Sequence, residues 1–263
     1  MKSNFLRSFA PLSLSLSLAL SLELGVIAIF PQTLMAQSSA TMFNQGVTER
    51  GEITKTKVDF KPPKVGAPEN RKGGASRGSS CSSNRNSLKA LLPESNLGLT
   101  VEKYPTFFVY IPPTSTQLAE FELYEGNKNS TVVYKTRFIL PKTAGIFTFN
   151  LPNNNTLQPL EVGKNYHWFF SIICNPQDRS EDIYIEGWVQ RIIPSPALVS
   201  QLAKAAPRYR PALYAEAGIW HETITTLAEL RYSRPQDSTL VTDWEELLKS
   251  VGLSKFAKEP LNH

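Results

Sequence analysis

Cysteine and histidine, on which many catalytic and metal centres depend, are scarce in this chain. The 263 residues include two cysteines and three histidines. The histidines, His167, His221 and His263, are far apart in the sequence, so no pair has the short spacing of a zinc-binding motif. The sequence therefore indicates no metal site, no cofactor site and no catalytic residues organised around a metal ion.

Most of the chain also lacks net charge of either sign. The net charge is +5, yet residues 91–263 hold sixteen Lys and Arg against eighteen Asp and Glu. The basic excess lies in residues 49–90, where ten basic residues face four acidic ones. This tract lacks the interleaved aromatic side chains on which bases stack, so no nucleic-acid partner is expected.

The N-terminal segment has the pattern of an export signal. Lys2 and Arg7 precede an apolar run from Phe9 to Phe30, and Ala36 ends a short exit before polar sequence. A basic start, an apolar stretch and a small residue at the cleavage point predict a signal peptide over residues 1–36. The protein is therefore expected to be exported, to the periplasm or to the extracellular space.

The alternative is that the apolar run stays in place as an N-terminal anchor in the inner membrane. Glu23 lies within the run and argues against this, because a carboxylate near the bilayer centre costs about 2.5–3.5 kcal/mol. After cleavage the protein is not expected to be an integral membrane protein.

Both cysteines, Cys81 and Cys174, lie beyond this segment, where an oxidising compartment favours pairing. The sequence predicts a disulfide between them, and a loop of about ninety residues closed in this way gives roughly 4–5 kcal/mol in the chain-entropy model. The alternative is a free nucleophilic cysteine, for which neither neighbourhood supplies a histidine partner.

Residues 37–86 are rich in Gly, Ser, Pro, Lys and Arg and show almost no apolar periodicity. Such a segment buries too little surface to offset the entropy of ordering, so a flexible basic arm is expected, and deletion of residues 37–80 should leave folding intact. The arm is either a solvated linker or a binding site for anionic envelope material. The candidate anion-binding residues are Arg71, Lys72, Arg77 and Arg85.

Residues 87–193 show short alternating apolar runs separated by turn residues, which is typical of an antiparallel sandwich. The clearest local signal is Leu160 followed, six residues on, by Tyr166 at the start of a strand. This spacing indicates a tyrosine corner, in which the hydroxyl bonds to upstream backbone. The expected fold is mainly β with α, beginning with an immunoglobulin- or fibronectin III-like β-sandwich.

Residues 194–263 change to helical periodicity. The spacing predicts helices around Leu198–Ala205, Ala212–Ala217 and Ile219–Leu230, and a fourth that begins at Asp237 or Thr242. The second and third resemble one degenerate tetratricopeptide helix pair. One such pair is not stable by itself, so this C-terminal helical unit is expected to lean on the sandwich or on a partner.

Other residues with chemical potential have ordinary explanations. Gly74–Gly78 matches a nucleophile elbow but lacks a flanking strand and helix. The oxygen-rich loop Asn175–Asp182 contains Arg179 and is expected to be a solvated turn rather than a calcium site. His167 is expected to be half exposed on a strand. His221, beside Glu222 on a helix, is the one candidate for proton transfer.

Several phrases together resemble a family of exported cyanobacterial proteins catalogued only as a domain of unknown function. The resemblance runs from about Arg71 to Leu261 and implies export and a partner-dependent role, with no activity to carry over. Its phrases are Arg71-Lys72-Gly73-Gly74, Arg77-Gly78, Leu88 to Glu94, Gly98-Leu99-Thr100, Tyr104-Pro105-Thr106-Phe107, Gly163 to Trp168, Glu186 to Arg191 and Asp243-Trp244.

The sequence thus favours an exported, non-enzymatic interaction or scaffold module of the cell envelope with a protein partner. The alternative is an envelope hydrolase that uses carboxylates and His221. The two differ in one structural property: an enzyme needs a concave pocket in which ionisable groups converge, whereas a binding module needs an exposed apolar patch or an open sheet edge.

Overall fold

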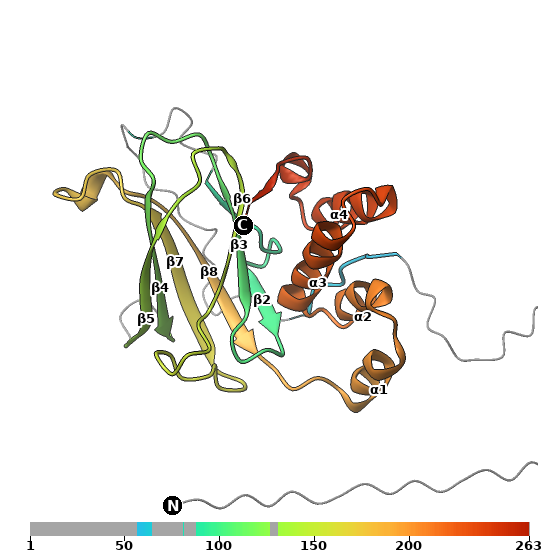
Figure 1. Cartoon of the computed structure of the whole chain (residues 1–263). Helices are drawn as coiled ribbons and strands as arrows, with labels where there is room; N and C mark the ends of the chain where they lie inside the picture. The colour runs from blue at the N-terminus through green and yellow to red at the C-terminus, as the bar shows by residue number, and fades with distance from the viewer. Residues whose placement is uncertain (1–56, 65–80, 82–87, 127–130, 263) are drawn as a thin grey trace, which may run out of the picture. The chain divides into compact units, whose positions relative to one another are not determined.

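The computed structural model describes residues 57–64, 81, 88–126 and 131–262. They all belong to one compact unit and form two β-sheets and a group of helices (Figure 1). The strands are β1 (Lys89–Ala90), β2 (Leu97–Thr100), β3 (Thr106–Ile111), β4 (Leu118–Glu125), β5 (Val132–Ile139), β6 (Gly145–Asn150), β7 (Asn165–Ile172), β8 (Ile183–Arg191) and β9 (Leu261–Asn262), and the helices are α1 (Pro196–Lys204), α2 (Arg210–Glu216), α3 (Trp220–Ser233) and α4 (Ser238–Ser250).

The two sheets are largely antiparallel. One has the order β1-β3-β6-β9 and the other β2-β8-β7-β4-β5. Two pairs at sheet edges are parallel, β2 with β8 and β6 with β9. The expected antiparallel β unit followed by helices is therefore confirmed at this level, although the short strands β1, β2 and β9 were not predicted.

Aromatic side chains fill the space between the sheets. Phe107 of β3 lies 5.1 Å from the ring of Phe121 on β4 and 5.4 Å from that of Trp168 on β7. Phe149 of β6 lies 4.8 Å from Phe121. These residues alternate with outward-facing ones because successive side chains of a strand point to opposite faces. The alternation visible in the sequence is thus the alternation between the two faces of each sheet.

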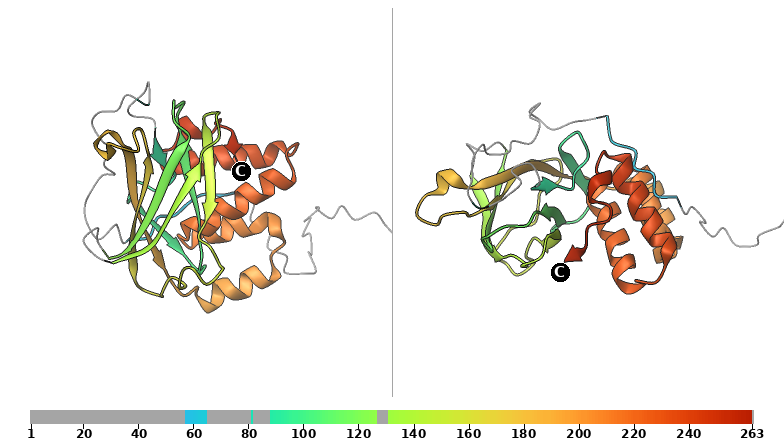
Figure 2. Two further views of the ribbon diagram at one scale, coloured as in Figure 1. Left: turned by 60° about the vertical axis from the view of Figure 1, so that its left-hand side comes forward. Right: turned by 90° about the horizontal axis from the view of Figure 1, so that it is seen from above.

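The helices cover the outer face of the four-stranded sheet (Figures 1 and 2). The Trp220 indole N–H donates to the Leu91 carbonyl at 2.8 Å, and Phe108 of β3 faces Trp244 of α4. The same buried cluster includes residues of both sheets and of α2, α3 and α4. The helical unit therefore packs against the sandwich, which is one of the two alternatives predicted for it.

Residues 57–64 are part of this folded unit, so the expectation of a flexible arm is wrong for them. Val58 and Phe60 are buried, whereas Lys57 and Asp59 point outward. The Phe60 ring meets that of Trp220 edge-on at 4.9 Å, and the Lys61 N–H donates to the Ala215 carbonyl. Two apolar residues in a polar tract give no detectable period, and only the helices supply the partners that bury them.

The fourth helix begins at the first of its two predicted starts. Asp237 is the N-cap of α4, and its carboxylate accepts a hydrogen bond from the Thr239 N–H at 3.0 Å. A second cap, Ser195, accepts from the Leu198 N–H and opens α1 with Pro196 in its first turn. Both caps satisfy amide groups that the first helical turn leaves without an intrahelical partner.

The tyrosine corner is present between β6 and β7. The Tyr166 hydroxyl accepts a hydrogen bond from the Glu161 N–H at 3.0 Å, and the Tyr166 ring is buried. Burial raises the pKa of Tyr166, so its hydroxyl is neutral at physiological pH. The contact ties the β6–β7 connection to the first residues of β7.

Replacement of Tyr166 by phenylalanine should therefore lower the free energy of unfolding by about 1–3 kcal/mol, because the Glu161 N–H loses its acceptor. Urea titration followed by tryptophan fluorescence measures this. Tyr104→Phe is the matched control, since its hydroxyl makes only a 3.4 Å contact with the Leu157 carbonyl. Equal costs for the two variants would contradict a special role for the corner.

Candidate functional site

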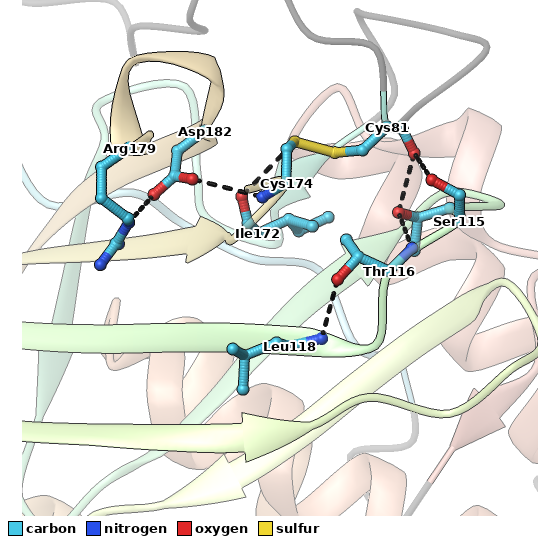
Figure 3. Close-up of a disulfide and its surroundings, with 9 residues drawn as sticks. Cys81, Ser115, Thr116, Leu118, Ile172, Cys174, Arg179 and Asp182 are labelled. Atoms are coloured by element: carbon cyan, nitrogen blue, oxygen red, sulfur yellow. Dashed lines mark hydrogen bonds and ion pairs between the residues drawn. A yellow bond between two sulfur atoms is a disulfide. The ribbon is translucent and has the colours of Figure 1, made fainter. Parts of the chain in front are cut away.

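The disulfide joins the two cysteines as predicted (Figure 3). The Cα atoms of Cys81 and Cys174 are 5.3 Å apart, and the two residues are separated by 93 positions in the sequence. The Cys81 carbonyl accepts hydrogen bonds from the Thr114 hydroxyl at 2.9 Å and from the Ser115 N–H at 3.1 Å. Cys81 is thus fastened to the β3–β4 connection as well as to the end of β7.

The oxygen-rich loop beside the disulfide is held by ion pairs. Arg179 binds Asp182 and also reaches Glu120 of β4, at 3.0 Å. Burial raises the pKa of Glu120, but hydrogen bonds from Arg137, Lys135 and Arg179 outweigh it and bring the pKa to about 2. No group of metal-ligating side chains occurs in the parts of the chain that the structure describes. Arg179 therefore connects this loop to β4 through its ion pairs with Asp182 and Glu120.

His221 and Glu222, the candidates for proton transfer, lie where α3 meets the sheets. The His221 Nδ1 atom is 2.8 Å from the Thr106 carbonyl, and because a carbonyl only accepts, Nδ1 carries the proton. The ring is 3% exposed, and a Cβ on Gly98 would come within 2.5 Å of Nε2. Burial lowers the pKa of His221 to about 4, so the ring is neutral at physiological pH.

Glu222 fastens the first turn of α3 to the segment after β2. One carboxylate oxygen, Oε1, accepts hydrogen bonds from the Thr100 hydroxyl and from the N–H groups of Val101 and Glu102. Burial raises the pKa of Glu222 to about 7, against the lowering effect of these hydrogen bonds. Its other oxygen, Oε2, has no hydrogen-bond partner among the described residues.

His221 and Glu222 can each hold a proton, but both side chains are buried and a substrate has little access to them. Neither residue lines either of two hollows on the described surface. One hollow lies beneath the tyrosine corner and includes Glu125, Glu161 and Tyr166, and another lies between β6 and α3 and includes Thr148 and Tyr232. The His221–Glu222 contacts are those of a buried junction between a helix and a sheet.

His167 is not half exposed, as its position on a strand had suggested, but 4% exposed. Its ring stacks on that of Trp188 at 4.2 Å with an angle of 4° between the planes, and its Nε2 is 3.3 Å from Glu186. Sequence reasoning missed this group because its members come from different strands. His167, Glu186 and Trp188 alternate along β7 and β8 with the residues that face the core. This alternation is the sequence signal that could have placed them together on the outer face of the sheet.

Several predicted positions lie outside the described residues. These are the signal peptide, the Gly74–Gly78 motif and the candidate anion-binding residues Arg71, Lys72, Arg77 and Arg85. The open edge of the five-stranded sheet, by contrast, is described: β5 ends the row, and within the described residues it pairs only with β4.

The molecule is thus a two-sheet β-sandwich with helices packed on one sheet, a disulfide, and its only described histidines in buried contacts. The chain belongs to the family described as Domain of Unknown Function (DUF928), whose model matches residues 72–261. A search of curated proteins and a search of solved structures each gave no match.

Proposed function

We propose that the protein is an exported, non-enzymatic interaction or scaffold module of the cell envelope, which binds a protein partner along the edge of β5. The observation that carries this proposal is the combination of an eight-residue edge strand with buried ionisable groups. Strand addition at such an edge is a common mode of peptide recognition, since the unpaired backbone groups supply affinity.

The side chains of β5 favour this use of its edge. Lys135 and Arg137 bind Glu120 at 3.0 and 2.9 Å, and Lys135 also binds Glu122. The charged groups are therefore held over β4, and in the described part of the chain β4 alone pairs with the backbone of β5. Val132 and Ile139, at the two ends of the strand, are 45% and 74% exposed and offer an apolar contact at each end of this edge.

Export is supported by the disulfide and by the N-terminal sequence pattern. None of the helices in the described parts of the chain has the length and hydropathy of a membrane span. A periplasmic or extracellular location follows from cleavage after residue 36, and attachment to the inner membrane follows if the segment is retained.

We also propose an immunoglobulin-like sandwich and a tetratricopeptide-like helix pair as the finer fold. The order β1-β3-β6 in one sheet and β8-β7-β4-β5 in the other supports an immunoglobulin-like connectivity, with the tyrosine corner before β7. The contact of α2 with α3 supports a tetratricopeptide-like pair only weakly, because α2 has seven residues. An interaction module is a frequent use of such sandwiches, although fold alone does not assign function.

Site-specific photo-crosslinking in intact cells tests the proposal. A crosslinking residue at position 132 and another at 139 should capture the same partner, because the two positions flank one strand. Val199 of α1 is the matched control, since it is an aliphatic residue that is 51% exposed. Different captured proteins at 132 and 139, or the same protein at 199, would contradict binding along β5.

A further inference from the structure

The side chains of β5 fall into two sets, one on each face of the five-stranded sheet. Lys135 and Arg137 bind carboxylates on the outer face. Tyr134, Thr136 and Phe138 alternate with them and lie on the inner face, toward the other sheet. A strand that pairs with β5 continues both faces, because its own side chains alternate in the same way. The two faces of β5 therefore set different requirements on the residues of that strand.

The inner face of β5 is an incomplete edge of the aromatic core. The Phe138 ring lies 4.9 Å from that of Phe149 and 5.5 Å from that of Phe147. Phe138 and Tyr134 are nevertheless only partly buried, and no described strand follows β5 in its sheet (Figure 1). Apolar side chains on an added strand cover these two rings, and burial of apolar surface stabilises association. The inward positions of the partner are therefore expected to be apolar.

The outer face of β5 presents positive charge over a buried carboxylate. Lys135, Arg137 and Arg179 all bind Glu120, at 3.0, 2.9 and 3.0 Å. The side chains of these three bases are between 39% and 60% exposed, whereas that of Glu120 is 3% exposed. Glu122, which also binds Lys135, is less exposed than the bases. A partner at this edge therefore meets the bases rather than the carboxylate that holds them.

Arg137 has donors for a further carboxylate. Within the described residues, its guanidinium contacts Glu120 through Nε alone. The planar guanidinium carries further N–H groups, whose geometry matches the two oxygens of a carboxylate. The pKa of the Glu120 carboxyl is about 2, so this group is charged at physiological pH and keeps the guanidinium in place. An acidic side chain on an added strand therefore meets a positioned donor.

We propose that the segment bound along β5 carries two acidic residues separated by one apolar residue, with the acidic side chains opposite Lys135 and Arg137. This inference rests on the proposed binding at the β5 edge and adds the chemistry of the partner. The spacing follows from the strand period of two, because the two bases are two positions apart. The residue between the acids lies opposite Thr136 on the inner face, and the flanking positions meet the exposed Val132 and Ile139.

Fluorescence anisotropy of labelled nine-residue peptides tests this inference with the mature chain, residues 37–263. The probe has Glu-Val-Glu at its centre, between threonine and valine residues, and its counterpart has Lys-Val-Lys. The glutamate peptide should bind at least about tenfold more tightly at low salt, because opposite charges on paired strands attract and like charges repel. This preference should shrink at about 0.5 M salt, which screens the charges.

Two single variants test the assigned bases without emptying the surroundings of Glu120. Glu122→Gln frees Lys135 from one carboxylate, so it should bind the glutamate peptide about threefold more tightly. Arg137→Gln should bind this peptide about fivefold less tightly, while Lys135 and Arg179 still hold Glu120. The control Lys204→Gln removes a positive charge at an exposed position of α1 and should leave binding unchanged.

The inference is overturned if the glutamate peptide does not bind, if the lysine peptide binds equally well, or if Glu122→Gln fails to tighten binding. Equal binding of a glutamate peptide interrupted by two prolines also overturns it, because proline prevents strand pairing and the glutamates then act only as a polyanion. The proposed function is decided separately, by crosslinking at positions 132 and 139. If one partner is captured at both positions but the captured segment lacks the acidic pair, binding along β5 stands and this inference is wrong.

Discussion

Replacement of Phe60 by alanine is expected to lower the free energy of unfolding by about 3–5 kcal/mol, as for other buried phenylalanines. The side chain is 4% exposed and meets Trp220, the first residue of α3, edge-on. The truncation removes apolar surface and leaves a cavity between the N-terminal segment and α3. Chemical denaturation monitored by circular dichroism measures the loss.

Asp59→Ala is the matched control, because Asp59 is the exposed neighbour on the same extended segment. It should change stability by less than about 0.5 kcal/mol. Deletion of residues 37–56 should likewise be tolerated, whereas a deletion that continues through residue 64 should destabilise the fold. A Phe60→Ala protein as stable as the wild type would contradict the assignment of residues 57–64 to the core.

The second large effect is a pair of opposed pH dependences at His221 and Glu222. The folded-state pKa of Glu222 is raised to about 7 from 4.5, so the folded protein binds more protons than the unfolded chain between these values. Its contribution to stability therefore falls as pH rises from about 4.5 to about 7, by on the order of 3 kcal/mol.

His221 acts with the opposite sign. Its folded-state pKa is lowered to about 4 from 6.5, so the unfolded chain binds more protons in this window. The contribution of His221 to stability therefore rises with pH between about 4 and about 6.5, by a similar amount. Over the shared range the two effects oppose each other, and these two groups together should contribute little net pH dependence to the wild-type protein.

Removal of either group should reveal the other. Glu222→Gln should give a protein whose stability rises with pH from 4 to 6.5, and His221→Asn should give one whose stability falls from 4.5 to 7. Denaturation at a series of pH values measures both slopes, with the exposed Glu229→Gln of α3 as the control. Slopes of the same sign in the two variants would contradict the buried, oppositely shifted pair.

The sequence by itself determined much of the local structure. Alternation along β4 identified Ala119, Phe121 and Leu123 as inward-facing, and all three are buried. The spacing of Tyr166 predicted its hydrogen bond, and the two cysteines predicted their pairing. These features depend on the period of a strand, on a short loop or on the presence of two cysteines. Each of these can be recognised from residues close together in the sequence or from the composition.

Tertiary structure alone decided the features that depend on distant partners. Phe60 stands in a polar tract and is buried against Trp220 of α3. His167 stands at an outward position of its strand, yet Trp188 of the next strand lies against its ring. Glu222 ionises near neutral pH because its helix buries it against the chain after β2. Burial by a remote element leaves no periodic trace in the sequence, which is why these three were not predicted.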